Sequence, residues 1–456
     1  MNSTIASFSK NHNEKIIHFF SEDSSILKCY AHFCGFIKRR RTLTASSLIS
    51  MLTISSLSSK PTTLVNMTSA LKSIDPKIVI TQSALHERLI SPACLLFVQK
   101  IFAEVLRINI LKVVNNSYEL LDSFKRVLIQ DCSSWKLPEN LKDFYKGPGR
   151  SGSKAALKIN VMYDLKNARF IHISDHAGVK SDHTLGKESL HLIEKEDLIL
   201  RDLGFLNVES LEKIEKVGAY YLSRLSGSIS LRLRKNGKPI SLEKLYDKYA
   251  KDGELDLWVF VGSEKHYCRL IAYKCPQEIA DKRRRDLSKY SKTKGHKTTS
   301  ENISRKGFNA YLTNVPIKIW PAIMIPTLYR VRWQIELIFK TCKSQMAINH
   351  FEGKNVNRLR ILLYSKWIAI LLCTNFYALA SYCLKREFNT ELSFFKLMNW
   401  LLVNEAFRKL VFKKAKKAKL IDFILEMRRT CCKDKRTRKT TMDMVETHLN
   451  PYEKVI

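Results

Sequence analysis

The sequence predicts a mixed α/β core that lies between two helical regions, and three observations lead to this prediction. Short apolar runs bounded by turn residues alternate with helical periodicity between residues 121 and 225. Before residue 120 and after residue 385, apolar residues recur at helical spacing with few strand signals. The chain has 456 residues and 45% hydrophobic content, which is enough for about two to four structural units with a buried core.

Residues 1–120 are predicted to be helical. Helical spacing is found in the segments 46–57, 64–73 and 83–111, with Pro61, Pro76 and Pro92 as separators. A run of four basic residues, Lys38 to Arg41, comes just before the first of these helices. Such a run is either a solvated charged surface or the contact surface for a polyanion.

Residues 121–225 are predicted to form the first part of the α/β core. The expected strands are 126–130, 157–163, 169–174, 197–201 and 219–225. The expected helices are 184–195 and 208–217. Two of the strands are followed directly by an aspartate: Asp131 follows the first strand and Asp202 follows the fourth. A hairpin followed by alternating helices and strands is typical of a mixed α/β core.

Residues 226–309 interrupt this rhythm and are predicted to be a β-rich basic insertion. Strands are expected at 229–234, 255–262 and 267–275. A basic stretch follows that includes Lys282, Arg283, Arg284 and Arg285, and then a polar segment at 291–302. A strand at 309–315 returns the chain to the core.

Residues 310–384 are predicted to be the second part of the core, with helices at 329–343 and 361–384. The second of these is apolar and nearly long enough to cross a bilayer. Lys366, Asn375 and Ser381 interrupt it, so we expect a buried core helix and no membrane association. Residues 385–456 are predicted to be a basic helical region, with one patch formed by Lys413, Lys414, Lys416 and Lys417.

Charge and cysteine content restrict the partners and the compartment. Lys and Arg number 78 against 43 Asp and Glu, a net charge of +35 at pH 7. The basic residues are spread along the chain, so nucleic acid is a more natural partner than a membrane surface. The 11 cysteines form no regular framework, which favours a reducing compartment, the cytoplasm. His266, Cys268 and Cys275 lack a fourth ligand at normal spacing, so no zinc site is expected.

The helix predicted at 329–343, YRVRWQIELIFKTCK, carries the most informative pattern of the chain. Four polar side chains stand at i, i+3, i+7 and i+14, namely Tyr329, Arg332, Glu336 and Lys343. On one regular helix they point within about 60° of one another. The apolar residues Val331, Ile335, Ile338 and Cys342 lie on the opposite side and are expected to face a core. The same spacing also fits an ordinary surface helix with solvated charges.

Three carboxylates from distant parts of the sequence can share one site. Asp131 and Asp202 stand at the ends of predicted strands, where side chains of an α/β sheet converge. Together with Glu336 they could hold one or two Mg²⁺ ions, which favour a few carboxylates plus water and phosphate oxygens. An aspartate at a strand end is also a common cap or turn residue. Asp164 and Asp175 compete for the same role, and Asp175 is the more serious rival.

The chain resembles the DDE-class bacterial transposases of the insertion sequence four family. That family carries a Tyr-x2-Arg-x3-Glu-x6-Lys signature, which Tyr329, Arg332, Glu336 and Lys343 match without a gap. Asp202, in RDLGF, resembles the second-aspartate motif of the family. Asp131, in IQDCSSW, resembles the first, although Cys132 is less typical there. The resemblance covers about residues 80–380 and includes ITQSALHERL at 80–89.

The resemblance implies a ribonuclease H-like catalytic core, interrupted by the β-rich insertion between the second aspartate and the glutamate. It implies that Asp131, Asp202 and Glu336 are catalytic metal ligands for two Mg²⁺ ions, which Mn²⁺ would replace. Tyr329, Arg332 and Lys343 would contact DNA phosphates. The implied activity is cleavage at the ends of the element, followed by attack of the freed 3′-hydroxyl on target DNA.

Further expectations follow from the same resemblance. The implied partners are double-stranded DNA, as terminal inverted repeats and target, and a second copy of the chain in a homodimer on DNA. The protein would be cytoplasmic and associated with the nucleoid. In related enzymes a hairpin forms on the element's end, and an aromatic side chain can stack on a flipped base. Trp258, Phe308 and Trp320 are the aromatic residues considered for that role, and none is preferred.

Two other functions remain open at this stage. One is a nuclease of the same fold that cleaves DNA without joining it. The other is a DNA-binding protein without catalysis, against which the three carboxylates weigh, because acidic groups near phosphate oppose binding unless a metal ion compensates them.

Overall fold

The computed structural model describes nine stretches of the chain. They are 24–38, 43–57, 63–110, 121–149, 152–263, 265–295, 297–351, 353–404 and 417–434. The predicted basic residues Arg39 to Arg41, and Lys413, Lys414 and Lys416, lie outside these ranges.

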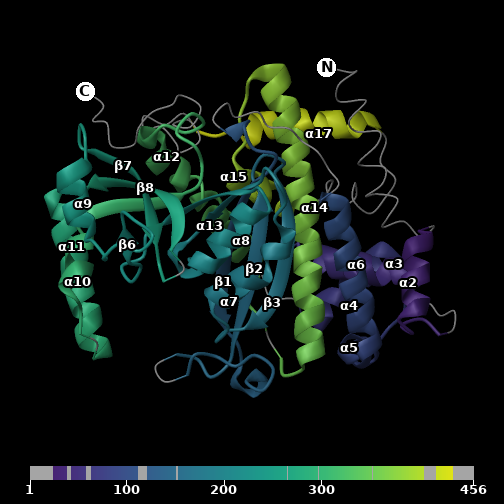
Figure 1. The fold of residues 1–456 in the computed structure, drawn as a ribbon. Helices are drawn as coiled ribbons and strands as arrows, with labels where there is room; N and C mark the ends of the chain where they lie inside the picture. The colour runs from purple at the N-terminus through teal and green to yellow at the C-terminus, as the bar shows by residue number, and fades with distance from the viewer. Residues whose placement is uncertain are drawn as a thin grey trace.

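The N-terminal region consists of helices, as predicted (Figure 1). They are α2 (Ser25–Phe33), α3 (Ala45–Ser56), α4 (Leu64–Ile74), α5 (Gln82–Ile90) and α6 (Pro92–Ile110). The hydroxyl oxygens of Thr44, Thr63 and Thr81 accept backbone N–H groups at the starts of α3, α4 and α5. The predicted helical segment at 83–111 is divided at Pro92, one of the prolines expected to separate helices, because the residue before it is extended and the chain bends there by 70°.

A nine-stranded sheet forms the centre of the described structure. Its strands are β1 (Val127–Lys136), β2 (Ala156–Asp164), β3 (Arg169–Ala177), β4 (Leu198–Arg201), β5 (Tyr220–Arg224), β6 (Leu231–Arg232), β7 (Glu254–Val261), β8 (His266–Lys274) and β9 (Phe308–Thr313). Their order is β3-β2-β1-β4-β5-β9-β8-β7-β6. β1, β4 and β5 are parallel, and β2 and β3 extend the sheet as an antiparallel hairpin.

The segment between β5 and β9 extends the same sheet at its other edge. β9 pairs with β5 on one side and with β8 on the other, so β8, β7 and β6 continue from the parallel strands. The segment also contains helices α9 (Leu242–Tyr249), α10 (Gln277–Lys294) and α11 (Ser300–Arg305). The predicted basic tail at 282–285 is therefore helical, and the predicted strand at 229–234 is reduced to two residues.

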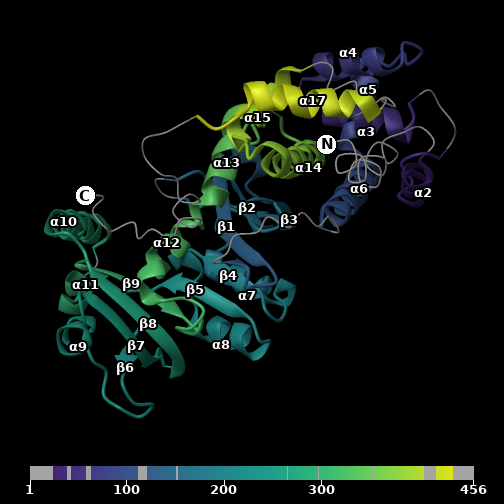
Figure 2. The same ribbon diagram turned by 90° about the horizontal axis from the view of Figure 1, so that it is seen from above.

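The two faces of the sheet are covered by different helices (Figure 2). α13 (Trp333–Met346) packs against β1, and α14 (Val356–Phe388) packs against β3 and α6. On the other face lie α7 (Asp182–Glu188) and α8 (Val208–Lys216), with α8 against β5 and β8. Alternate residues of a strand serve opposite faces: Val127 and Ile129 belong to the core shared with α13 and α14, whereas Leu128 belongs to the core shared with α8.

The long apolar helix α14 is buried, as the sequence analysis predicted. By length and composition alone it could cross a membrane, but 83% of its most apolar window is buried inside the protein. A helix covered by protein on most sides is the usual core helix of a large domain. Helices α15 (Phe394–Val403) and α17 (Lys417–Thr430) follow α14 in the chain, and both pack against it.

Candidate active site

Asp131 and Asp202 lie at the same level of two neighbouring parallel strands. In the pairing of β1 with β4, Gln130 stands opposite Arg201, and the two aspartates follow directly. Because side chains alternate along a strand, both aspartates point to the face that carries α13. The apolar runs before them are buried in the sheet, so the register of the sheet sets the positions of the two carboxylates.

The predicted end of the first strand was wrong. β1 does not stop at Asp131 but continues to Lys136, paired residue by residue with β2. The residues after Asp131 are polar and indicate a turn in the sequence, yet the hairpin β2–β3 supplies a partner for their backbone. The parallel neighbour of β1, β4, does end at this level. Asp131 therefore lies just beyond the last residue pair of β1 and β4, next to Asp202.

The signature segment 329–343 is not a single helix, so the prediction of one regular helix there was wrong. α12 (Ile325–Arg330) ends before Arg332, and α13 begins at Trp333. Between them the backbone bonds run from residue i to i+3, as in Arg332 N–H to the Tyr329 carbonyl. This tighter turn changes the phase between the two helices. Tyr329 is therefore buried and Glu336 exposed, although the predicted core residues Val331, Ile335, Ile338 and Cys342 are all buried as expected.

Arg332 lies among the three predicted carboxylates and interacts with each of them. Its side chain is 7% exposed, and its Nη2 donates to Glu336 Oε1 at 2.6 Å. Its Nη1 lies 3.6 Å from Asp131 Oδ2. Burial opposes the charge of the guanidinium, but Tyr329, Asp202 and Glu336 more than compensate and raise the pKa of Arg332. One buried cation thus offsets part of the charge of the three predicted carboxylates.

The pKa of Asp131 reflects its burial first, and then the hydrogen bond and the charges around it. Burial raises this pKa from 3.8 to about 6, and the negative charges of Asp202 and Glu336 act in the same direction. The backbone N–H of Cys132, which donates to Asp131 Oδ1 at 2.8 Å, and the charge of Arg332 act in the opposite direction. A carboxyl group that resists ionisation in this way gains from a nearby cation.

Tyr329 lies next to this group, and two guanidinium groups approach its ring. Arg224 from β5 and Arg332 each lie 5.9 Å from the centre of its ring. Its hydroxyl donates to the carbonyl oxygen of Arg201 at 3.3 Å, one residue before Asp202. Burial raises the pKa of Tyr329 to about 12. Tyr329 therefore remains a neutral hydrogen-bond donor that links α12 to the end of β4.

Lys343 lies two turns along α13 from Glu336, near the outer part of β1. Its Nζ is 5.8 Å from the centre of the Trp135 ring. Burial lowers the pKa of Lys343, and the charge of Asp131 opposes this effect. The structure thus brings all six predicted residues to one region, around the ends of β4, α12 and α13.

The rival aspartates have structural partners elsewhere. Asp175 lies inside β3, whereas the strand predicted at 169–174 ended just before it, and it accepts hydrogen bonds from Tyr145 and Tyr364 at 2.5 and 2.6 Å. Arg360 lies 3.4 Å away, so this cluster ties β3 to α14. Asp164 is fully buried and is held by neighbours in its own hairpin turn.

The donor chemistry of the carboxylate group suits divalent cations, but the side chains need to rearrange to bind one. Among the described residues, no three His, Cys, Asp or Glu side chains stand close enough to hold a metal ion as they are. Glu336 instead points to Arg332. Its side chain is 49% exposed, so it can change rotamer at low cost and turn toward the two aspartates. Three carboxylates at an open end of the sheet are ligands of the type that Mg²⁺ prefers.

Two basic residues were not predicted to have a role in the site or its support, Arg224 beside Tyr329 and Lys366 at the C-terminal end of α13. Arg224 lies inside the predicted strand 219–225 and carries no motif of its own, and only the sheet places it against Tyr329. Lys366 is 1% exposed in α14 and donates to the Met346 carbonyl at 2.6 Å, at the C-terminus of α13. Burial lowers its pKa to about 8. The sequence signal for Lys366 was its presence in an apolar helix, where a buried lysine requires a partner.

The aromatic residues considered for base stacking have different environments. Trp320 is fully buried against Phe124, and Phe308 is buried beside Tyr246. Trp258 is 38% exposed on β7 and stacks on Tyr267 of β8. Of the three, Trp258 is the one whose ring is open to solvent.

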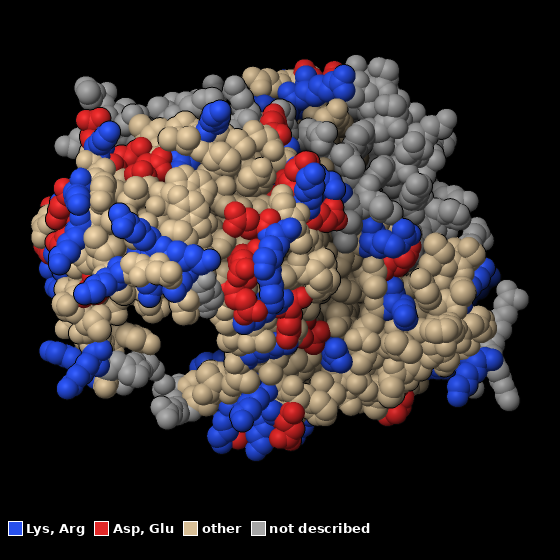
Figure 3. All heavy atoms as spheres, viewed as in Figure 1, with Lys and Arg blue, Asp and Glu red and all other residues tan. Residues whose placement is uncertain are grey.

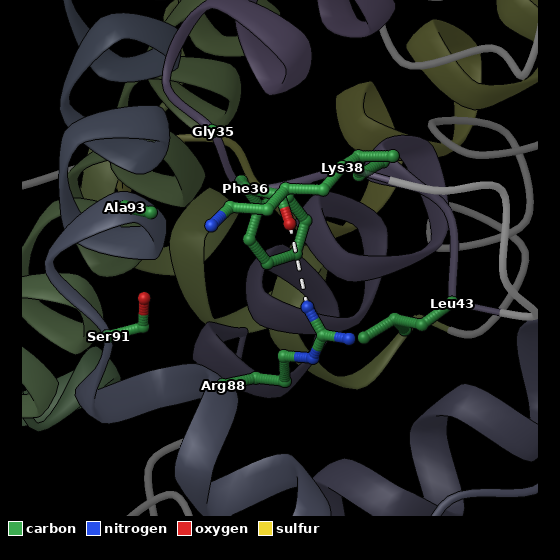
Figure 4. A pocket seen from close by; sticks show the side chains of 8 residues that line it. Gly35, Phe36, Lys38, Leu43, Arg88, Ser91 and Ala93 are labelled. Carbon is green, nitrogen blue, oxygen red and sulfur yellow. Dashed lines mark hydrogen bonds between the residues drawn. The ribbon is translucent and has the colours of Figure 1, made fainter.

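The surface in Figure 3 carries acidic and basic side chains mixed together over α7 and α8. A cavity of about 490 Å³ lies away from the carboxylates, in the N-terminal helical region (Figure 4). Lys38 and Arg88 line it, and Arg88 Nη1 donates to the Phe36 carbonyl at 3.5 Å. Lys38 is the described residue of the basic run predicted to contact a polyanion.

Comparison with known proteins gives a consistent result. The model of the family described as Transposase DDE domain matches residues 122–372. The chain is 28% identical over 384 residues to the transposase for insertion sequence element IS231F of Bacillus thuringiensis subsp. israelensis, covering 80% of each protein. It is 29% identical to the IS231B transposase of B. thuringiensis subsp. berliner, over 79% of this chain and 80% of that one. The IS1151 transposase of Clostridium perfringens is 30% identical over 60% of this chain and 62% of its own.

Proposed function

The chain belongs to the family of transposases with a DDE domain, and from this premise we propose that it cleaves the ends of its own mobile element and joins them to target DNA. The observation that carries the proposal is the grouping of three carboxylates around one buried arginine, inside the segment that the family model matches. Such a group opposes DNA binding unless cations neutralise it, so it favours catalysis over binding alone.

We assign the metal-ligand role to Asp131, Asp202 and Glu336. Enzymes of this family use divalent metal ions, and two Mg²⁺ ions are the proposal here, with Mn²⁺ as a substitute. Bound there, the ions supply the Lewis acidity that activates a water or a 3′-hydroxyl and stabilises the leaving oxygen. The raised pKa of Asp131 supports this assignment, because a cation would restore its ionised form.

The basic residues of the site are assigned to the DNA backbone. Arg332, freed when Glu336 turns to the aspartates, presents a planar guanidinium that can bind a phosphate with two hydrogen bonds. Arg224 also lies 5.9 Å from the centre of the Tyr329 ring, and we add it to the predicted set on this geometry. Lys343 stands further out along α13, beside Trp135, where a phosphate of the neighbouring nucleotide would lie.

The larger organisation is proposed on the same basis. The core would be ribonuclease H-like, with parts at 121–225 and 310–384 and the insertion at 226–309, between a DNA-binding region at 1–120 and a basic region at 385–456. Two ends must be cut and joined together, so we propose a homodimer on double-stranded DNA. Its place of action would be the cytoplasm, on the nucleoid.

The test is strand cleavage of a labelled duplex that carries the gene's own flanking DNA. Reactions would contain Mg²⁺ or EDTA and either the wild-type protein or Glu336→Gln. Glu212→Gln is a matched control, because Glu212 is a similarly half-exposed carboxylate on α8 that pairs with Lys216. Cleavage at a defined position, abolished by EDTA and by Glu336→Gln but kept in Glu212→Gln, supports the proposal.

Two results would change the proposed function. Cleavage without any joined product, in the presence of a target plasmid, would indicate a nuclease. Specific binding to the ends without cleavage by the wild-type protein would indicate a DNA-binding protein and would remove the catalytic assignment.

A further inference from the structure

The helix α10 carries a stripe of cations on its outer side. The basic residues that are exposed are Lys282, Arg285, Lys289 and Lys292. They stand at i, i+3, i+7 and i+10, so at about 100° per residue they occupy an arc of roughly 80°. At about 1.5 Å per residue the stripe is roughly 15 Å long. We call these four residues the α10 stripe.

The opposite side of α10 attaches the helix to the sheet. Ala280 is buried there, and Arg283 donates to Cys275 Sγ at 2.9 Å and to Asn309 Oδ1 at 3.0 Å. Arg284 pairs with Asp281 at 3.0 Å. The basic run of the sequence is thus divided by the helix, because Arg283 and Arg284 have structural partners whereas Lys282 and Arg285 point outward.

The cations of the α10 stripe have no partner within the described part of the protein. None of their side chains makes an ion pair or hydrogen bond with a described residue, although many other surface lysines pair with a carboxylate, as Lys213 does with Glu209. Asp286 is the one exposed carboxylate within the span of the stripe. Several unpaired like charges on one helix face repel each other. A bound polyanion would neutralise these charges and relieve the repulsion, so its binding to the α10 stripe is favourable.

A hydrogen-bonded connection joins α10 to the candidate active site. Asn309 Oδ1 accepts from Arg283 of α10 and, at 3.3 Å, from Arg224 of β5. Arg224 in turn lies on the ring of Tyr329. The α10 stripe and the catalytic group therefore belong to one framework held by the sheet, and Figure 2 shows α12 between α10 and α13.

We propose that the α10 stripe binds the phosphate backbone of the duplex whose end occupies the catalytic site. This proposal rests on the proposed function and adds the surface that holds the substrate away from the cleavage point. A stripe of about 15 Å matches roughly four base pairs of B-DNA at about 3.4 Å each, so the four cations can follow one strand or bridge a groove. The contacts are to phosphates, so they hold the duplex without reading its sequence. Figure 3 shows blue side chains at the lower left of the molecule, at the free end of α10.

The experiment measures binding of the end duplex in EDTA, which needs no catalysis. One variant replaces the α10 stripe by Lys282→Gln, Arg285→Gln, Lys289→Gln and Lys292→Gln. A control variant has the same change of charge on α7, α8 and the segment between them, by Lys187→Gln, Lys195→Gln, Lys213→Gln and Lys216→Gln. Glutamine is a good helix former, so α10 should persist, and circular dichroism would verify this.

The expected result is a decrease in affinity by roughly 100- to 3,000-fold for the α10 variant at about 0.1 M salt. The slope of log K against log salt should fall by about 2 to 3.5, at roughly 0.9 for each phosphate that the variant no longer neutralises. The control variant should change affinity less than about threefold and leave the slope as it is. Equal behaviour of the two variants would overturn the proposal.

A second arm separates the end duplex from target DNA. If the α10 variant binds and cleaves ends normally but joins them poorly to a target plasmid, the stripe holds the target and the proposal is wrong. If the wild-type protein fails to cleave ends at all while the α10 variant still binds them more weakly than the control, the catalytic assignment fails and the stripe remains a DNA surface.

Discussion

Replacing Asp131 by asparagine should make the protein more stable in the absence of metal while removing its activity. The ionised carboxylate of Asp131 is placed where the fold disfavours it, since burial and two neighbouring carboxylates raise its pKa from 3.8 to about 6. The asparagine side chain would keep an oxygen for the Cys132 N–H and would carry no charge. Repulsion between neighbouring carboxylates lowers the free energy of unfolding, and such a cost is expected at a site that binds cations.

The magnitude follows from the pKa difference between the folded and unfolded states. The shift of about 2 units, at about 1.4 kcal/mol per unit, lowers the free energy of unfolding by about 3 kcal/mol at pH 7. The folded-state pKa is raised, so this cost is fully present above about pH 6. It decreases as the pH falls from about 6 toward 3.8, to roughly half near pH 5, because the folded protein then takes up the proton that it prefers.

The assay is thermal unfolding in EDTA, compared between wild type and Asp131→Asn from about pH 4.5 to 8. The pKa of about 6 already includes the attraction between Asp131 and Arg332, so we expect a gain of about 3 kcal/mol at pH 7, or roughly 6–12 °C for a unit of about 250 residues. The gain should shrink toward the acidic end of this range. Mg²⁺ should stabilise the wild type and have little effect on the variant.

Asp175→Asn is the matched control in the same sheet. Asp175 accepts hydrogen bonds from Tyr145 and Tyr364 and lies beside Arg360, so removing its charge should destabilise the protein by about 1–3 kcal/mol. The two Asp→Asn changes thus have opposite expected signs. The reasoning is refuted if Asp131→Asn leaves the protein equally or less stable at pH 7 in EDTA, or if the difference does not depend on pH.

Three other predictions concern the site and its support. The apparent affinity for Mg²⁺, measured by titration calorimetry, should fall about tenfold per pH unit below about pH 6 as Asp131 takes up its proton, whereas a flat profile from about pH 5 to 8 would contradict the ligand role. Arg332→Lys should reduce end cleavage roughly 10- to 100-fold, because one ammonium group cannot replace a guanidinium that reaches both Asp131 and Glu336; full activity would argue against a planar phosphate contact. Tyr364→Phe should cost about 1–2 kcal/mol in urea unfolding, since it removes the 2.6 Å bond to Asp175, and an unchanged midpoint would show that this bond is dispensable.

The secondary structure of the core could be predicted because its strands are short apolar runs between turns. The strands at 157–163, 197–201 and 219–225 and the helix at 208–217 were found close to their observed bounds. Boundaries failed where polar residues continue an element. β1 extends past Asp131 and β3 extends past residue 174, because backbone pairing in the hairpin does not require apolar side chains.

The phase of the signature segment could not be predicted from its spacing. A single regular helix puts Tyr329 and Glu336 on one face, but the turn between α12 and α13 has bonds from i to i+3. Tyr329 is consequently drawn into the core against Tyr311, and Glu336 remains half-exposed. The apolar positions of the same segment were correct, since each helix separately preserves its own periodicity.

The sequence by itself determined the types of the elements, the basic character of the protein and the residue types of its site. These features depend on local periodicity and composition, which a short stretch of sequence contains in full. Only the tertiary structure decided that Asp131 and Asp202 share one level of the sheet and that Arg332 reaches between Asp131 and Glu336. It also decided which basic residues of 282–285 point to solvent. Contacts between segments that are distant in the chain depend on strand register and helix packing, and no local pattern in one sequence contains that information.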